Sequence, residues 1–349
     1  MITHFINSAS PTLIYTMDTP ILVTGTAGFI GHNLAHRLIE QGHRVIGYDC
    51  VNDYYPAAVK RARLEELTGH GEQYVHVEAD LCDIDTLQKT FATWKPQRVC
   101  HLAAQAGVPF SMREPFAYQK SNLEGFLNML ECCRHNGVER FAYASSSSVY
   151  GDSTAFPLSE AQRVDTPISL YAATKKANEL MAHSYTHLYG LQTIGLRFFT
   201  VYGPWGRPDM ALWIFAEKIS NGVGIPVFNN GDLQRDFTYI DDITAGVDNV
   251  LHKPDLEPYE IFNLGNNQSE NVMDMIRTIE SSLGKEAQII MKPPQPGDVK
   301  KTWADVSKAA AKLDYAPQTP ISVGIPAFCE WYLEHPELAA TVTKWRETS

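Results

Sequence analysis

The sequence predicts an α/β protein in which a doubly wound parallel sheet is followed by a smaller α/β domain. From Pro20 onward, short apolar runs alternate with amphipathic segments of helical length, the pattern of strands and helices in a parallel sheet. A glycine-rich turn separates the first apolar run from the first amphipathic segment, and the alternation breaks down after Arg197. Because 349 residues exceed the usual size of a single core, we expect two domains.

The expected elements begin with a buried strand at Ile21 to Val23 and a helix at Ile30 to Gln41, which Gly42 closes. Further strands are expected at 44–48, 74–77, 98–102 and 140–144, and two long helices at 115–133 and 170–189. These elements predict a Rossmann-type nucleotide domain at 17–197, to which 236–257 returns, and a substrate domain at 198–235 and 258–349. Residues 1–16 form an N-terminal extension.

Charge and composition exclude several classes of partner. The formal net charge of −11 argues against nucleic acid and anionic membranes. No stretch reaches the roughly 20 apolar residues that span a bilayer, and the first sixteen residues lack the features of a signal peptide. The six cysteines show no metal-ligand spacing, so we expect buried free thiols, a cytoplasmic protein and no metal site.

The turn from Thr24 to Gly31 predicts a dinucleotide site. Glycines there allow a tight turn and let the backbone approach a pyrophosphate, while the following helix offers its N–H groups to the phosphates. Asp49 lies 18 residues beyond Gly31, where a carboxylate binds the ribose hydroxyls and repels a 2′-phosphate, so NAD is favoured over NADP. Asp80 follows the next strand and either reaches the adenine amine or caps the helix at Asp83-Ile84.

A second group of residues predicts acid–base chemistry. Tyr171 and Lys175 share one face of an expected helix, and an ammonium near a phenol lowers the phenol's pKa, as would a positive nicotinamide ring. Alone, such a pair most often lies on the surface of a helix and has no catalytic role. However, the serine run at 145–148 closes the preceding strand, at the edge of a parallel sheet where ligands bind. Together these features indicate a catalytic base beside a bound dinucleotide.

The motifs resemble those of the extended short-chain dehydrogenase/reductases over nearly all of Pro20 to Trp331. Narrower stretches resemble UDP-glucuronate 4-epimerases, and these stretches are Asn52 to Tyr55, Ser169 to Glu179, Arg197 to Met210 and Arg235 to Asp242. The resemblance implies tightly bound NAD and an isomerase of carbohydrate metabolism. It would convert UDP-glucuronate to UDP-galacturonate through a 4-keto intermediate.

The resemblance also implies roles for individual residues. Tyr171 matches the catalytic base, Lys175 its partner, and Ser146 the hydroxyl that binds the reacting sugar oxygen. The residues implied to contact the cofactor are Gly25, Gly28, Phe29, Ile30, Gly31, Asp49, Asp80, Leu81, Leu102, Ala103, Ala104, Asn122, Tyr171 and Lys175. Those implied to contact the substrate are Ser146, Ser147 and Ser148 at the carboxylate, Thr200, Arg207, Arg235 at the pyrophosphate and Asp298 at a ribose.

Two departures affect these assignments. Pro109 stands where the family usually places an arginine, so a charged contact to the substrate is missing or supplied elsewhere. Gln295 stands where galactose epimerases carry another arginine, so Arg235 would carry more of the pyrophosphate charge.

Other functions stay open at this point. They are a 4-epimerase of a neutral UDP-sugar, a UDP-glucuronate decarboxylase or dehydratase, and a non-catalytic NAD-sensing protein. The acid that a dehydratase or decarboxylase places in the serine motif is replaced by Ser147-Ser148, and a sensor would be expected to lose Tyr171 or Lys175. These residues therefore favour the epimerase.

The two long helices also predict a homodimer. They resemble the pair that forms a four-helix bundle between subunits in this family. Their apolar positions Phe126, Met129, Leu130, Leu180 and Met181 would otherwise stay partly exposed, unless they pack within the monomer.

Overall fold

Seven parallel strands form the centre of the structure, a computed structural model that describes residues 19–293 and 300–348. The strand order is β11-β6-β5-β4-β1-β2-β3, so the direction of winding reverses between β1 and β4. The strands are β1 (Ile21–Thr24), β2 (Val45–Asp49), β3 (Tyr74–Glu78), β4 (Arg98–His101), β5 (Arg140–Ser146), β6 (Gln192–Phe198) and β11 (Tyr259–Leu264). The doubly wound parallel sheet predicted from the sequence is confirmed.

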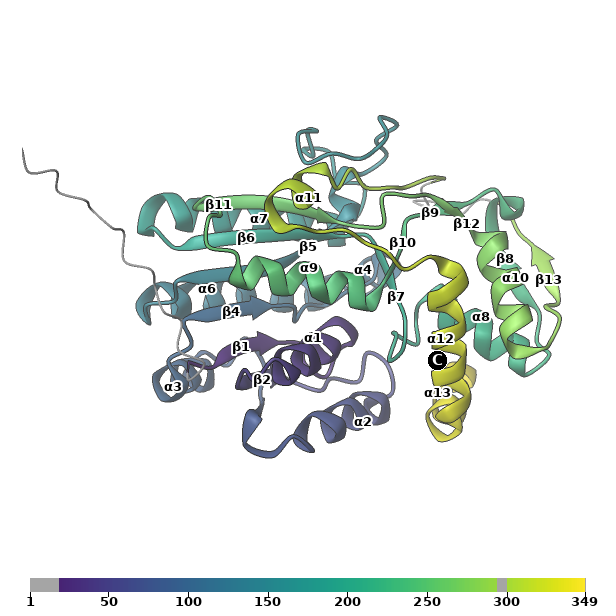
Figure 1. Ribbon diagram of the computed structural model, residues 1–349, viewed down its shortest axis with the longest axis horizontal. Coiled ribbons are helices and arrows are strands. Elements are labelled where there is room, and N and C mark those ends of the chain that lie inside the picture. Colours follow the sequence, from purple (N-terminus) through teal and green to yellow (C-terminus); the bar gives the residue numbers. More distant parts are fainter. Residues whose placement is uncertain (1–18, 294–299, 349) are drawn as a thin grey trace, which may run out of the picture.

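Helices cover both faces of this sheet (Figure 1). One face carries α1 (Phe29–Glu40), α2 (Ala57–Thr68), α9 (Ile240–His252) and α11 (Ser307–Leu313), and the other carries α3 (Ile84–Trp94), α6 (Gly125–His135) and α7 (Leu170–Tyr189). Side chains alternate along β1, because Ile21 and Val23 join the core on the first face while Leu22 joins the core on the second. The sheet is therefore buried on both sides.

The sheet extends one strand beyond the segment that the sequence analysis returned to it. That segment ended at residue 257, but β11 pairs with β6 along its whole length, from Tyr259 beside Thr193 to Leu264 beside Phe198. Glu260 and Asn263 interrupt the apolar pattern of this strand although both are buried, which is why the pattern did not reveal it. The expected boundary at 258 is thus wrong, and residues 259–264 belong to the sheet.

The long helix expected at 115–133 is also interrupted. The chain runs through α4 (Val108–Arg113) and α5 (Pro115–Tyr118), then a π-helical stretch at Gln119–Glu124, and enters α6. Such stretches recur at functional sites because they re-aim side chains. The helix expected at 170–189 is confirmed as α7 without interruption.

A smaller lobe lies beyond the carboxyl ends of the strands (Figure 1). Its helices are α8 (Ala211–Ser220), α10 (Val272–Leu283), α12 (Ile321–Glu334) and α13 (Pro336–Thr348). Its strand pairs are β7 (Thr200–Tyr202) with β10 (Phe237–Tyr239), β8 (Ile225–Val227) with β13 (Ile289–Met291), and β9 (Gln234–Arg235) with β12 (Glu270–Asn271). An aromatic core that includes Trp213, Phe328 and Trp331 holds this lobe together. Within the described ranges, every helix is too short or too polar to cross a membrane.

Candidate active site

A cavity of about 640 Å³ lies at the carboxyl ends of the strands. Its lining begins at the glycine turn after β1 and continues through the segments that follow β2, β3, β4 and β5 to the loop after β7. In open α/β sheets, ligands bind at this edge, where the winding direction reverses. The position of the cavity agrees with the site expected from the sequence.

The glycine turn forms one wall of the cavity. Gly25 has a positive φ of 81°, and a Cβ built there would lie 2.8 Å from the backbone nitrogen of Ala103. A Cβ on Gly31 would lie 2.1 Å from the carbonyl oxygen of Gly25, so no larger residue fits. Gly28 begins α1, and Phe29, Ile30 and Gly31 of its first turn line the cavity. Because a first helical turn leaves N–H groups without helical partners, this wall can bind a phosphate.

Two carboxylates lie at the ends of β2 and β3 on this side of the cavity: Asp49 ends β2, and Asp80 follows β3. Asp49 accepts hydrogen bonds from the amides of Ala27 (3.1 Å) and Val51 (2.8 Å), which fix its orientation beside the glycine turn. Asp80 accepts from the amide of Cys82 and pairs with Lys120 at 2.8 Å. The cap of α3 is Asp83, not Asp80, so the capping alternative for Asp80 is wrong. Leu81, Leu102, Ala103 and Ala104 line the same part of the cavity.

Tyr171 and Lys175 lie on the first turns of α7, whose N-cap is Ser169. The ammonium of Lys175 donates to the carbonyl oxygen of Ala144 at 2.8 Å, and burial lowers the pKa of Lys175 to about 8. Burial raises the pKa of Tyr171, while a hydrogen bond with Ser146 and the charge of Arg207 oppose that rise. Lys175 is therefore not among the protein groups that lower the pKa of Tyr171, contrary to expectation. Its ammonium is directed at a backbone carbonyl instead.

The serine run continues from β5 into a short 3₁₀ turn at Ser147–Tyr150. Ser146 accepts hydrogen bonds from both the amide (3.2 Å) and the hydroxyl (2.8 Å) of Ser148. Ser146 also lowers the pKa of Tyr171, so the two side chains lie close to each other. Ser147 and Thr200 also line the cavity.

Arg207 lines the cavity as part of a buried charged group. Its guanidinium pairs with Asp209 (Nε to Oδ1, 3.0 Å), which also accepts a hydrogen bond from the hydroxyl of Tyr54 at 3.0 Å. Burial raises the pKa of Asp209, but the charge of Arg207 outweighs this effect and holds the pKa below its usual range. Arg207, expected as a basic contact to the substrate, is therefore already paired with an ionised carboxylate.

Among the described residues, two of the expected site residues, Asn122 and Arg235, do not line the cavity. Asn122 is buried and bonds with the backbone of Gln105 and the hydroxyl of Thr174, so it holds the loop after β4. Arg235 donates to the carbonyl oxygens of Gln234 and Lys300 outside the cavity wall. Asp298 and Gln295 lie outside the described residues.

The cavity contains cations that the sequence analysis missed. Arg113 lies at its edge on α4, four residues after Pro109, with its guanidinium over the ring of Phe110. Lys60 lines the cavity near Asp49, and its ammonium bonds with Asn52 and lies over the ring of Tyr55. The analysis examined position 109 alone. The helical spacing from Pro109 to Arg113 was the signal that could have revealed this arginine.

The chain is similar to proteins of known family. The family model described as "NAD dependent epimerase/dehydratase family" matches residues 21–265. Protein CapI of Staphylococcus aureus is 47% identical over 331 residues, which cover 90% of this chain and 98% of CapI. UDP-glucuronate 4-epimerase 4 of Arabidopsis thaliana is 44% identical, over 90% of this chain and 75% of its own length. The crystal structure of UDP-glucuronic acid 4-epimerase from Bacillus cereus, in complex with UDP-glucuronic acid and NAD, has a TM-score of 0.85 and 33% identity, and the match covers 90% of this chain and 99% of that one.

The close contact at Gly31 generates a test of the glycine wall. We expect Gly31→Ala to abolish retention of the dinucleotide predicted from the sequence, because the new Cβ meets the Gly25 carbonyl and must displace the turn. The nucleotide released from denatured protein, measured by chromatography, checks this. Leu333→Ala, an exposed change on α12, is the control. Full nucleotide content in a folded Gly31→Ala variant would contradict the assignment.

Proposed function

The chain belongs to the NAD-dependent epimerase/dehydratase family, and we propose that it interconverts UDP-glucuronate and UDP-galacturonate by epimerisation at carbon 4 of the sugar. The observation that carries this proposal is that Ser146, Tyr171 and Lys175 line the same cavity as the glycine turn. A proton acceptor and a hydrogen-bond donor then meet the same sugar oxygen. The relatives named above support the choice of sugar.

The residues of the cavity fit NAD. The turn at Gly25 and Gly31 is a cradle that a Cβ would fill, and the first turn of α1 faces the cavity beside it. Asp49, held by two backbone amides, would bind the ribose hydroxyls, and Asp80 would lie towards the adenine. Lys175 and Tyr171 would lie at the other end of the cofactor.

The reaction needs a hydride acceptor and a hydride donor at one carbon, which NAD supplies when bound. The positive charge of bound NAD would favour the phenolate form of Tyr171, whose oxygen takes the proton of the 4-hydroxyl and later returns it. Ser146 donates a hydrogen bond to the same sugar oxygen and stabilises negative charge that develops there. Because Ser148 donates to Ser146, the single proton of the Ser146 hydroxyl is left to point at the sugar oxygen. The 4-keto sugar must turn over in the cavity before the proton returns.

The charged groups argue against loss of water or carboxylate. Asp209 is an acid in the cavity that the sequence analysis overlooked, but its pairing with Arg207 keeps it ionised at neutral pH. An ionised carboxylate cannot donate the proton that a dehydratase needs to expel water. In the serine run, the neutral Ser147 and Ser148 stand where a dehydratase or decarboxylase places an acid, and both line the cavity. Epimerisation is the outcome that these groups support.

The first test uses purified protein, UDP-glucuronate and no added NAD. We expect UDP-galacturonate by chromatography, and Tyr171→Phe should lower kcat about 10²–10⁴-fold because it removes the proton acceptor. The variant should keep its bound NAD, which distinguishes lost chemistry from a lost cofactor. UDP-xylose as the product would favour the decarboxylase, and no product from wild-type protein containing NAD would favour the sensor.

We further infer that Arg113 supplies the charged contact that Pro109 does not. Arg113 lies at the edge of the cavity, whereas the charge of Arg207 is already compensated by Asp209. Ser147, Ser148 and Thr200 would add neutral hydrogen bonds to the sugar carboxylate. Arg207 would remain close enough to orient the sugar.

This inference predicts charge selectivity. Arg113→Gln should weaken binding of UDP-glucuronate by roughly 10–100-fold, the scale of a hydrogen bond to a charged group, and should change binding of UDP-glucose by less than about 3-fold. Calorimetric titration of both nucleotides measures this, with the exposed Arg163→Gln as the matched control. Equal losses for both nucleotides would transfer the carboxylate contact to the serines, Thr200 and Arg207.

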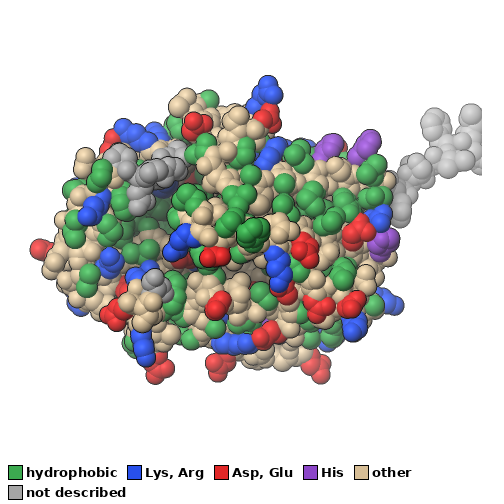
Figure 2. All heavy atoms as spheres, turned by 180° about the vertical axis from the view of Figure 1, so that it is seen from behind, with side chains coloured by type: hydrophobic (Ala, Val, Ile, Leu, Met, Phe, Trp, Pro, Cys, Tyr) green, Lys and Arg blue, Asp and Glu red, His purple; other side chains and the backbone are tan. Residues whose placement is uncertain are grey.

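We also propose that two copies of the chain associate through α6 and α7. Phe126, Met129 and Leu130 are buried in the monomer, so the expectation that they need a partner is wrong. Other apolar side chains are exposed on the same helices and on α5: Phe116 (80%), Leu127 (41%), Leu180 (58%) and Leu188 (64%). Hydrophobic side chains lie across the face of the molecule seen in Figure 2.

The dimer has its own test. Wild-type protein should scatter light as a dimer, and a Leu127→Glu/Leu180→Glu double variant should be a monomer because it places charges in the apolar interface. Val323→Glu on α12, where Val323 is 57% exposed, is the control and should stay dimeric. A wild-type monomer, or a double variant that remains a dimer, would overturn the proposed interface.

We infer a cytoplasmic location from the cysteines. All six are free thiols, and Cys100, Cys132, Cys133 and Cys329 are buried. A reducing compartment keeps thiols in this state.

A further inference from the structure

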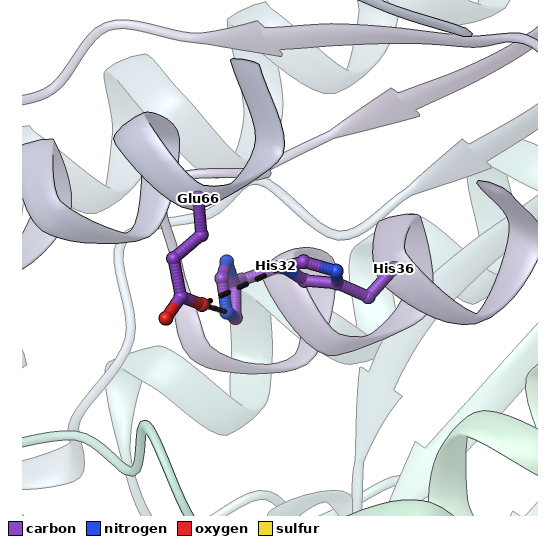
Figure 3. Close-up of side chains that lie close together, drawn as sticks. All are labelled: His32, His36 and Glu66. Carbon is purple, nitrogen blue, oxygen red and sulfur yellow. Dashed lines mark ion pairs between the residues drawn. The ribbon is translucent and has the colours of Figure 1, made fainter. Parts of the chain in front are cut away.

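Three side chains with metal-binding groups converge between α1 and α2, outside the catalytic cavity (Figure 3). His32 and His36 are one helical turn apart on α1, so they share a face of the helix. Glu66 projects from α2 towards both rings. The sequence analysis did not recognise this group because its members come from two helices 30 residues apart.

The distances within the group suit a small divalent ion. One oxygen of Glu66 lies 3.2 Å from Nε2 of His32 and 3.6 Å from Nε2 of His36, and the three ligand atoms lie within 4.8 Å of one another. Zinc binds imidazole and carboxylate at about 2.0–2.2 Å in a tetrahedron, which separates neighbouring ligand atoms by roughly 3.3–3.5 Å. Both contacts to Glu66 therefore fit a shared ion with little movement.

Hydrogen bonding leaves one ligand atom without a partner. Nδ1 of His36 lies 3.1 Å from Nε2 of His70, whereas Nε2 of His36 is buried and has no hydrogen-bond partner. In the tautomer that donates its Nδ1 proton to His70, His36 would direct the lone pair of Nε2 at the carboxylate of Glu66. Metal-bound histidines are held in this way, through the ring nitrogen that does not bind the ion. Two facing electron-pair donors are stabilised by a cation between them.

The surroundings of the three side chains also suit a metal. The side chain of His32 is buried, whereas that of Glu66 is 43% exposed, so an ion between them would still meet water. Neutral imidazoles and an ionised carboxylate are the forms that bind metals. The positive charge of Arg63 acts on His32, but its guanidinium donates to four oxygens, those of Ala27, Tyr55, Trp205 and Gly206.

We propose that His32, His36 and Glu66 form a binding site for one divalent transition-metal ion of the zinc class. Two imidazoles and one carboxylate favour zinc, cobalt and nickel over calcium and magnesium, which prefer oxygen ligands. The ion joins α1, which begins at the glycine turn, to α2. The ring of His32 also contacts Trp205, two residues before Arg207, with ring centres 5.2 Å apart. The site is thus structural, and it steadies both walls of the catalytic cavity.

The test is metal binding by the holoenzyme, without a histidine tag and after dialysis against a chelator. Calorimetric titration with ZnCl₂ should show about one equivalent bound, and CoCl₂ should give the visible absorption of a tetrahedral Co²⁺ site. Glu66→Gln and His36→Ala should each weaken Zn²⁺ binding by roughly 100-fold or more. Zn²⁺ should raise the Tm of the wild-type protein and leave the Tm of Glu66→Gln unchanged.

His43→Ala is the matched control, because His43 is a half-buried histidine that stacks on His252 instead. It should bind Zn²⁺ as tightly as the wild-type protein. Circular dichroism without metal identifies a variant that fails to fold, and Glu66→Gln keeps the shape of the side chain for that reason. The proposal is overturned if the wild-type protein shows no saturable binding, or if folded Glu66→Gln and His36→Ala bind Zn²⁺ as well as His43→Ala does.

Discussion

The position of Tyr171, the proposed catalytic base, depends on an ion pair buried two helical turns further along α7. Glu179 accepts two hydrogen bonds from Arg197 on β6, at 2.8 and 2.9 Å, and a third from Ser145 on β5 at 2.7 Å. Both charged side chains are almost completely buried. Removing one partner of such a pair typically costs about 3–5 kcal/mol, because the other charge is left uncompensated. This pair fixes the helix that carries Tyr171 and Lys175 against the strand that carries Ser146.

The same network extends to the edge of the sheet. Arg197 also donates to the hydroxyl of Tyr150, which donates to Asn263 on β11 at 2.7 Å. Tyr150 ends the 3₁₀ turn of the serine run, so its hydrogen bonds with Arg197 and Asn263 hold the end of this turn against the sheet. On the other side, Asn122 in the π-helical stretch bonds with Gln105 and Thr174 and joins the loop after β4 to α7. Asn122 therefore acts on the site through the backbone it positions.

The sequence was sufficient to predict site residues where the pattern that identifies them lies within one helix, strand or turn. The glycine turn, Asp49 at a strand end and the pair of Tyr171 and Lys175 are local patterns, and the structure brings all of them to one cavity. It was insufficient where a charge is set by a distant partner. The pairing of Arg207 with Asp209 and Tyr54, and the direction of the Lys175 ammonium, depend on tertiary contacts that no spacing reveals. β11 was missed for the related reason that its polar residues are satisfied only by other segments, as Asn263 is by Leu158 and Asp305.

The distribution of charge along the cavity explains how a chain with a net charge of −11 can hold an anionic substrate. Asp49 ends β2 and Asp80 follows β3, on the half of the sheet proposed to meet the ribose and adenine of the cofactor. Lys175, Arg113 and Arg207 come from segments that follow β5, β4 and β7, on the half proposed to meet the sugar nucleotide. The low-dielectric walls of a cavity strengthen the electric field of the charges that line it. The attraction of an anionic ligand therefore depends less on the net charge of the molecule than on which strands carry the lining charges. The winding of the sheet thus sets the electrostatic polarity of the site.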